Sequence, residues 1–262
     1  MIWSRALRAA VAGGQMYAGL LGLLVLWELA CRQLNIPPWL LPPPTQIATE
    51  TWSLRDILPA HVFATVKEIV GGFLLAVLAG VPLAVAVVYS PLLRRLIYPV
   101  LLMLQSVPKV AIAPILLLWI GYGLVSNMIV AATVAFFPIV INTATGLESV
   151  DAELLELTRS LGSSKLRVLL RVRLPWSLPF LFSGLKVAIT LAVIGAIVAE
   201  FIGADKGLGY LILTNSGAMR TAVMFGVLLL LSLLGTLCFY AVVALERTLC
   251  PWYMAKAERS GI

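Results

Sequence analysis

The sequence is short of the residues that most catalytic sites need. His61 is the only histidine, so Ser-His or Cys-His nucleophile pairs and histidine metal sites have little material. The three cysteines form no metal or redox spacing, and we assign them no chemistry. The run from Gly162 to Lys165 lacks the first glycine and the spacing of a phosphate-binding loop. We therefore expect a non-catalytic chain that holds no cofactor and binds no nucleotide itself.

Charged residues are also scarce. They make up 12% of the 262 residues, while hydrophobic residues make up 61%. Soluble domains have about 25% charged and about 45–50% apolar residues. No long polar stretch remains for a separate soluble enzyme, and no soluble basic face with aromatic platforms is present for nucleic acid. The composition predicts one integral membrane domain.

Six apolar segments approach or exceed the roughly 20 residues that cross a bilayer. Each is expected to be helical, because lipid offers no partner for free backbone amides and no segment alternates as in a membrane barrel. The sequence thus predicts an all-α membrane protein. Pro108 and Pro114 interrupt the third segment, so a broken or re-entrant helix fits there as well. The expected spans are 9–31, 62–89, 96–120, 124–147, 178–203 and 223–245.

The first span is expected to be retained and not cleaved as a signal peptide. At about 23 residues it is longer than a typical signal h-region. Glu28 also stands where a lipoprotein cleavage site needs an aliphatic residue. Glu28 and Arg32 have the i,i+4 spacing of a helical ion pair. We divide the chain into residues 1–61 with this helix and an external loop, a core at 62–246, and a cytoplasmic tail at 247–262.

The basic residues predict the orientation by the positive-inside rule. With both termini in the cytoplasm, most lysines and arginines fall inside, and Lys109 lies within a span. The net charge of +7 is then explained by contact with anionic lipids of the inner leaflet. The basic residues left outside are Arg32, Arg55, Lys67, Lys206 and Arg220.

The loop at 148–175, between the fourth and fifth spans, is the most charged interval of the chain. Asp151 is suited to cap a helix, and Glu153 and Glu156 follow where the helix dipole favours negative charge. An apolar stripe with helical spacing runs along the same segment, which predicts a short amphipathic helix. The members of the stripe are Val150, Leu154, Leu157 and Leu161.

A second short helix is expected after a glycine turn. Gly162 fits the left-handed position that ends a helix, and Ser163 or Ser164 can cap the next one. Pro175 is expected to stop that helix before the fifth span begins. Such a helix-turn-helix is suited to transmit force as a rigid body. An amphipathic linker that rests on lipid headgroups is the alternative.

The loop resembles a known signature. It begins with Glu156-Leu157-Thr158, continues after three residues with Gly162, and ends after nine more with Val172-Arg173-Leu174-Pro175. This run is similar to the EAA motif of binding-protein-dependent ABC importer permeases, EAA-x3-G-x9-I-x-LP. Leu157 and Thr158 replace the two alanines, and Val172 replaces the isoleucine.

Further blocks resemble the nitrate, sulfonate and taurine branch of these permeases, which also includes permeases for thiamine precursors and riboflavin. The resemblance covers roughly residues 62–245. The blocks are Val107-Pro108-Lys109 with Ala113-Pro114, Trp119 to Gly123, Phe137 to Val140, and Ala199 to Ala204 followed by Gly207-Leu208-Gly209.

The resemblance implies a type I ABC importer permease with a cytoplasmic coupling helix in the bacterial inner membrane. Its implied partners are ATPase subunits that bind ATP-Mg, an extracytoplasmic substrate-binding protein and a second permease copy, forming a homodimer. It places ATPase coupling on Glu156, Arg159, Ser160, Leu161, Gly162, Leu174 and Pro175.

Polar groups within spans are costly and indicate function or a buried partner. We predict that Gln105, Lys109 and Asn142 line the translocation pathway, and that Glu200 is a structural partner of the loop with Lys206. Two helix faces made of small residues are expected to pack within the subunit. One consists of Gly184, Ala188, Ala192 and Ala196, and the other of Ala76, Gly80 and Ala84.

The competing function is an ion-gradient-driven secondary transporter. Such proteins often show inverted repeats with matched broken helices and intramembrane acids. The two halves of this sequence are not alike, and the charged loop has no purpose in such a protein. We therefore favour the ATP-driven importer.

Overall fold

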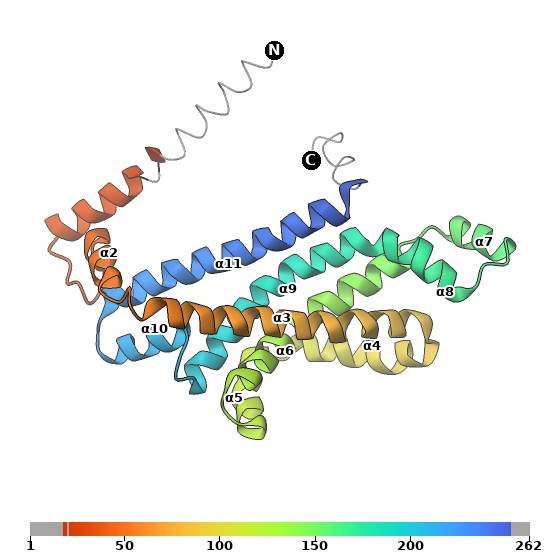
Figure 1. The fold of residues 1–262 in the computed structure, drawn as a ribbon, viewed down its shortest axis with the longest axis horizontal. Coiled ribbons are helices and arrows are strands. Elements are labelled where there is room, and N and C mark those ends of the chain that lie inside the picture. The colour runs from red at the N-terminus through yellow and green to blue at the C-terminus, as the bar shows by residue number, and fades with distance from the viewer. Residues whose placement is uncertain (1–17, 20, 253–262) are drawn as a thin grey trace, which may run out of the picture. The chain divides into compact units, whose positions relative to one another are not determined.

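The computed structural model describes residues 18–19 and 21–252, without the side chains of residues 102, 105 and 106. Every regular element in this part of the chain is a helix, as expected (Figure 1). The described residues form two compact units. One joins the residues up to Pro59 to Leu211–Leu230, and the other joins Ala60–Tyr210 to the residues from Leu231 on.

Four stretches of the described chain are long and apolar enough to cross a membrane. They contain α3 (Leu58–Tyr89), α6 (Leu124–Glu148), α9 (Leu174–Gly203) and α11 (Thr221–Leu249). These four correspond to the second, fourth, fifth and sixth expected spans. The first expected span falls partly on residues outside the described part, and its described residues are helical and continue to residue 33.

The third expected span is two helices, α4 (Pro91–Ser106) and α5 (Lys109–Ile120). The chain between them is extended at Val107, with φ −73° and ψ 131°. A residue before proline disfavours the helical conformation, and Pro108 has no N–H to donate. With 12 residues, α5 is about 18 Å long, less than the roughly 30 Å of a hydrocarbon core. Here the chain follows the broken alternative.

Short elements connect the long helices. The segment between α6 and α9 contains α7 (Ala152–Ser160), α8 (Lys165–Val168) and a π-helical turn η1 (Leu169–Arg173). The remaining short helices are α2 (Pro44–Trp52), which precedes α3, and α10 (Leu208–Gly217), which follows α9.

Small residues bring α6 and α9 into close contact, and the two helices lie side by side in Figure 1. A Cβ atom built on Gly184 would lie 2.8 Å from the Pro138 carbonyl oxygen, and one on Gly195 would lie 2.7 Å from the Ala131 Cα. Only glycine permits such an approach of two backbones. The face that begins at Gly184 is buried throughout, which confirms packing within the subunit.

The second small-residue face packs in the same way. Ala76, Gly80 and Ala84 of α3 are buried, and a Cβ on Gly80 would lie 3.1 Å from Ile139 of α6. Ala84 belongs to an apolar cluster with residues of α4 and α6, among them Leu101. Both small-residue faces therefore serve contacts within this chain.

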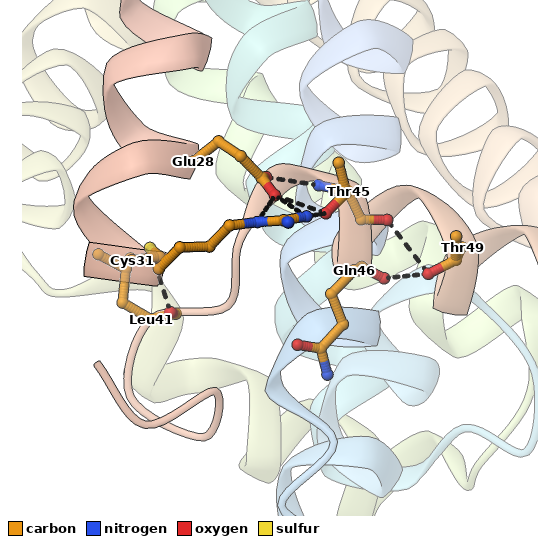
Figure 2. Close-up of polar contacts among 7 residues, drawn as sticks. Glu28, Cys31, Leu41, Thr45, Gln46 and Thr49 are labelled. Atoms are coloured by element: carbon orange, nitrogen blue, oxygen red, sulfur yellow. Dashed lines mark hydrogen bonds and ion pairs between the residues drawn. The ribbon is translucent and has the colours of Figure 1, made fainter. Parts of the chain in front are cut away.

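In the other unit, an ion pair attaches the helix at 18–33 to the start of α2. Arg32 lies 2.6 Å from Glu28, which confirms the predicted i,i+4 pair. The Glu28 carboxylate also accepts hydrogen bonds from the Thr45 backbone N–H (3.0 Å) and hydroxyl (2.8 Å) (Figure 2). Pro43, at the N-cap of α2, has no side-chain acceptor for that N–H. Glu28 therefore supplies the cap from another helix.

Candidate functional site

The loop after α6 begins with α7, close to where the acidic residues predicted a helix. Asp151 occupies the N-cap position, but its side chain accepts no capping hydrogen bond, so the expected carboxylate cap is absent. Its backbone carbonyl accepts the Leu155 N–H at 3.2 Å. Glu153 lies in the first turn, where the helix dipole favours an acid. Glu156 is the fifth residue of α7 and is exposed, so it lies beyond the first turn.

The predicted apolar stripe is divided between the core and the surface. Val150 is buried and Leu154 is half-buried, which anchors the base of the loop. Leu157 and Leu161 are 56% and 74% exposed. Adjacent exposed apolar side chains on a rigid helix are typical of a surface that binds a partner. Leu157, one of the two residues that replace the alanines of the EAA motif, is therefore part of the accessible face.

Gly162 makes the predicted left-handed turn, with φ +66°. The Gly162 N–H donates to the Arg159 carbonyl at 2.9 Å, and the Ser163 N–H donates to the Thr158 carbonyl at 3.1 Å. These two bonds define a Schellman motif, which closes the end of α7. Ser164 then caps α8 by accepting the Arg167 N–H at 3.4 Å. The turn therefore has a defined geometry on both sides of the glycine.

The expected stop at Pro175 is wrong. Helical structure continues from α8 through η1 into α9, and Pro175 lies in the first turn of α9. Proline lacks an N–H, and its ring clashes with the carbonyl four residues earlier in a regular α-helix. The wider π-helical turn just before it relieves this conflict. Leu174 is half-buried at the join, and Pro175 is exposed.

The cytoplasmic side of the expected topology carries a concentration of positive charge. A cavity of about 220 Å³ lies between the loop and the end of α3, lined by Arg159, Lys165 and Arg173 among others. The Arg173 guanidinium lies 5.2 Å from the centre of the Tyr89 ring. At the end of α6, Glu148 pairs with Arg94 of α4 at 3.2 Å. The loop thus contacts α3 through Arg173 and Tyr89, and α4 through Glu148 and Arg94. Figure 1 shows α7 and α8 beyond the ends of α6 and α9.

The predicted pathway residues lie at different places around α4, α5 and α6. The Lys109 ammonium, at the start of α5, lies 4.7 Å from the centre of the Phe137 ring. The Asn142 amide donates to the Pro138 carbonyl of its own helix at 2.8 Å. Gln105 is in the last turn of α4, but its side chain is outside the described part. No contact joins Lys109 to Asn142 among the described side chains.

Glu200 is buried and binds the loop after α9. Its carboxylate accepts hydrogen bonds from the Thr65 hydroxyl of α3 at 2.6 Å and from the Gly209 N–H at 2.5 Å. The expected structural role toward the segment after α9 has support, although the bond is to the backbone of Gly209, in the first turn of α10, and not to Lys206. A Cβ on Gly207 would overlap the carboxylate, which explains the glycine there. His61 contacts the Gly207 backbone at 3.0 Å and completes the connection.

Two polar pairs between helices, one buried and one partly exposed, were not predicted from the sequence. Asn127 of α6 donates to Glu68 of α3 at 2.8 Å. Lys186 of α9, which the topology had assigned to the cytoplasm, forms an ion pair at 3.0 Å with Glu246 of α11. The available signal was a charged residue inside an apolar span, which usually has a buried partner.

No cluster of metal-ligating side chains occurs in residues 18–19 and 21–252. Cys31, Cys238 and Cys250 are free and lie in apolar surroundings or are buried. The only histidine in the sequence contacts backbone and a tyrosine ring. The loop between α6 and α9 is therefore described as the candidate site without metal or thiol chemistry in this part of the chain.

The chain matches known proteins over most of its length. Residues 72–249 match the family described as "Binding-protein-dependent transport system inner membrane component". The formylaminopyrimidine transport permease protein of Halalkalibacterium halodurans is 38% identical over 231 residues, covering 88% of this chain and 92% of the relative. The riboflavin transport system permease protein of Chloroflexus aurantiacus is 36% identical, covering 88% and 87%.

Other comparisons agree on the branch and on the fold. The taurine transport system permease protein of Escherichia coli is 29% identical, covering 88% of this chain and 86% of the relative. A chain of the inward-facing MetNI methionine ABC transporter superposes with a TM-score of 0.65 at 22% identity, covering 75% of this chain and 98% of that one. This likeness shows the type I permease fold.

The family match and the relatives decide between the two functions considered. These relatives are named as permease proteins of transport systems, and two further relatives are named as ABC transporter permease proteins. The chain therefore belongs to the family of binding-protein-dependent transport system inner membrane components, as a multi-pass membrane permease subunit of an ABC importer whose ATP hydrolysis takes place in a separate subunit.

Proposed function

We propose that the loop at 148–175 binds the ATPase subunit and couples ATP hydrolysis to movement of the permease. The exposed pair Leu157 and Leu161, on a helix closed by the Gly162 turn, carries this proposal. Arg159 and Ser160 lie on the same helix and are exposed, so they are available to polar groups of the partner. Leu174 and Pro175 join the loop to α9, which receives the movement.

We propose the wider assembly from the family to which the chain belongs. Two copies of the chain form a homodimer, two ATPase subunits hold ATP-Mg below it, and an extracytoplasmic binding protein delivers the solute above it. Both termini of the chain lie in the cytoplasm. The support for this orientation is the excess of lysine and arginine on one side of the expected spans.

Gln105, Lys109 and Asn142 are the proposed pathway residues. The support is their position at the break between α4 and α5 and on α6. Lys109 begins α5 directly after Pro108, and broken helices in transporters commonly supply backbone groups to solute sites. The names of the relatives include formylaminopyrimidine, riboflavin and taurine, so we propose a small organic solute as the cargo.

Substitution of Gly162 tests the coupling role. A Cβ at this position meets nothing within 4 Å, so the only cost of a side chain is the left-handed backbone. Gly162→Asn is a matched control, since asparagine adopts positive φ, whereas Gly162→Val is strained because valine is β-branched. We expect Gly162→Val to abolish solute-stimulated ATP hydrolysis in the reconstituted importer, and Gly162→Asn to retain it. Equal stimulation in both variants contradicts the coupling role.

A further inference from the structure

The cavity of about 220 Å³ between the loop at 148–175 and the end of α3 has a positively charged lining. Arg159, Lys165 and Arg173 all line it, and none of the described residues around it is acidic. These three cations form no ion pair with a carboxylate of the described residues. Like charges gathered around one cavity repel each other, and a bound anion removes that cost. The lining therefore favours an anionic ligand.

Arg173 is held in a position suited to a phosphate group. It is half-buried, and its guanidinium lies 5.2 Å from the centre of the Tyr89 ring. A cation–π contact of this kind leaves N–H donors of the guanidinium available. The guanidinium fork matches the oxygen atoms of a phosphate in pairs, and a lysine such as Lys165 adds a second charge.

The volume of the cavity limits the size of the ligand. It corresponds to about seven water molecules at the volume that each occupies in the liquid. Sites for drug-sized ligands are larger, at roughly 300–1,000 Å³. A single phosphate group fits this space, whereas a whole nucleotide does not.

The cavity lies on a different face of α7 from the exposed leucines. Leu155 is half-buried and lines the cavity, whereas Leu157 is 56% exposed. Successive residues turn by about 100° around a helix, so these two side chains point to nearly opposite sides of α7. The surface proposed for the ATPase thus leaves the cavity open toward α3.

The surroundings of the cavity favour a lipid over free phosphate. Val88 and Tyr89 line it from the last turn of α3, where a membrane-spanning helix ends. Leu166 and Leu170 are 64% and 55% exposed in the helical stretch that begins at Lys165, so apolar side chains adjoin the cations. An anionic phospholipid uses both features, whereas free phosphate uses only the cations. Basic pockets at the cytoplasmic ends of membrane helices bind headgroups of this kind.

We propose that this cavity binds the phosphate of an anionic phospholipid from the cytoplasmic leaflet. Lys165 and Arg173 donate to the phosphate oxygens, and the acyl chains pack beside Leu166 and Leu170. The inference rests on the proposed function, because the proposed orientation places the loop at the cytoplasmic surface. It goes beyond that function by adding a lipid as a specific ligand of the loop.

The test measures binding of dioleoylphosphatidylglycerol to the permease–ATPase complex in detergent by native mass spectrometry. Dioleoylphosphatidylcholine has the same chains and the same phosphate, but its choline cation cancels the charge. We expect phosphatidylglycerol to bind about 5-fold tighter than phosphatidylcholine. Lys165→Gln and Arg173→Gln should each lower its affinity about 5-fold, because a basic residue near a membrane surface contributes about 1 kcal/mol. Arg159 stays unchanged, since it also belongs to the proposed coupling residues.

Arg167→Gln and Arg171→Gln are the matched controls. Both residues are exposed in the same helical stretch and carry the same charge, but they do not line the cavity. Both control variants should bind phosphatidylglycerol as the unsubstituted complex does. An equal loss of affinity in all four variants indicates unspecific attraction to a basic surface and overturns the proposal, as does equal binding of the two lipids.

Two further arms separate other sources of an anion. Inorganic phosphate should bind more weakly than phosphatidylglycerol in a calorimetric titration, because it buries no acyl chain. Phosphate that binds as tightly as the lipid overturns the lipid assignment. Binding of phosphatidylglycerol only after removal of the ATPase assigns the cavity to an acidic segment of that subunit, which also overturns the proposal. The measurements need no ATP, so their failure is separable from a failure of the Gly162 experiment.

Discussion

The ion pair between Lys186 and Glu246 predicts that the loss of Lys186 and the loss of Glu246 lower the free energy of unfolding by different amounts. The Lys186 ammonium lies 3.0 and 3.2 Å from the two Glu246 carboxylate oxygens. The Glu246 side chain is only 4% exposed, whereas that of Lys186 is 27% exposed. Lys186→Met keeps the length of the side chain but leaves a buried, uncompensated carboxylate. Glu246→Leu leaves an ammonium that is already partly exposed.

The expected magnitudes follow from these exposures. Removing one partner of a buried pair costs about 3–5 kcal/mol, and we expect Lys186→Met to fall in this range. A lysine on a flexible stem moves its charge toward the interface, so Glu246→Leu should cost only about 1.5–3 kcal/mol, the value of hydrogen bonds to a charged group. The double variant leaves no unpaired charge, so its free energy of unfolding should return to within about 1 kcal/mol of the unsubstituted chain.

The assay is unfolding of the purified chain in mixed micelles by titration with sodium dodecyl sulfate, followed by circular dichroism. A double-mutant cycle gives the interaction energy of the pair. Two results refute the reasoning: a greater loss of stability for Glu246→Leu than for Lys186→Met, or a double variant as unstable as Lys186→Met.

Two further predictions concern packing and the coupling surface. Gly184→Ala places a methyl group 2.8 Å from the Pro138 carbonyl oxygen and should lower the free energy of unfolding by about 1–3 kcal/mol, whereas Gly217→Ala, where a Cβ meets nothing, should be neutral or stabilising in the same titration. Leu161→Asp should reduce the ATPase recovered with the affinity-purified permease, because Leu161 is 74% exposed at the C-cap of α7, while Leu161→Met should retain it. Equal recovery in both Leu161 variants would place the ATPase elsewhere.

The elements that lipid itself dictates were predictable from the sequence. Four apolar runs gave four long helices with ends within a few residues, since a helix is the means to satisfy the backbone in a bilayer. Gly162 was predictable because a glycine after an amphipathic run ends a helix. The prediction that Pro175 ends a helix was wrong, because that rule takes no account of a π-helical turn just before the proline.

The polar pairs between helices could not be predicted from local sequence patterns. Thr65 and Glu200 are 135 residues apart in sequence, and Glu68 and Asn127 are 59 apart. Each pair forms only once two helices pack at a definite depth and rotation, which periodicity within one segment does not specify. Glu68 was still detectable as a lone acid inside an apolar span.

The π-helical turn has a mechanical consequence. Because it permits the helix to pass through Leu174 and Pro175, helical structure is continuous over 39 residues from Lys165 to Gly203. The 30 residues of α9 alone are about 45 Å long, so a tilt of about 5° at one end displaces the other by about 4 Å. No unstructured linker separates the loop from α9. If the loop binds the ATPase as proposed, a small movement there reaches the opposite end of α9 through the helix itself.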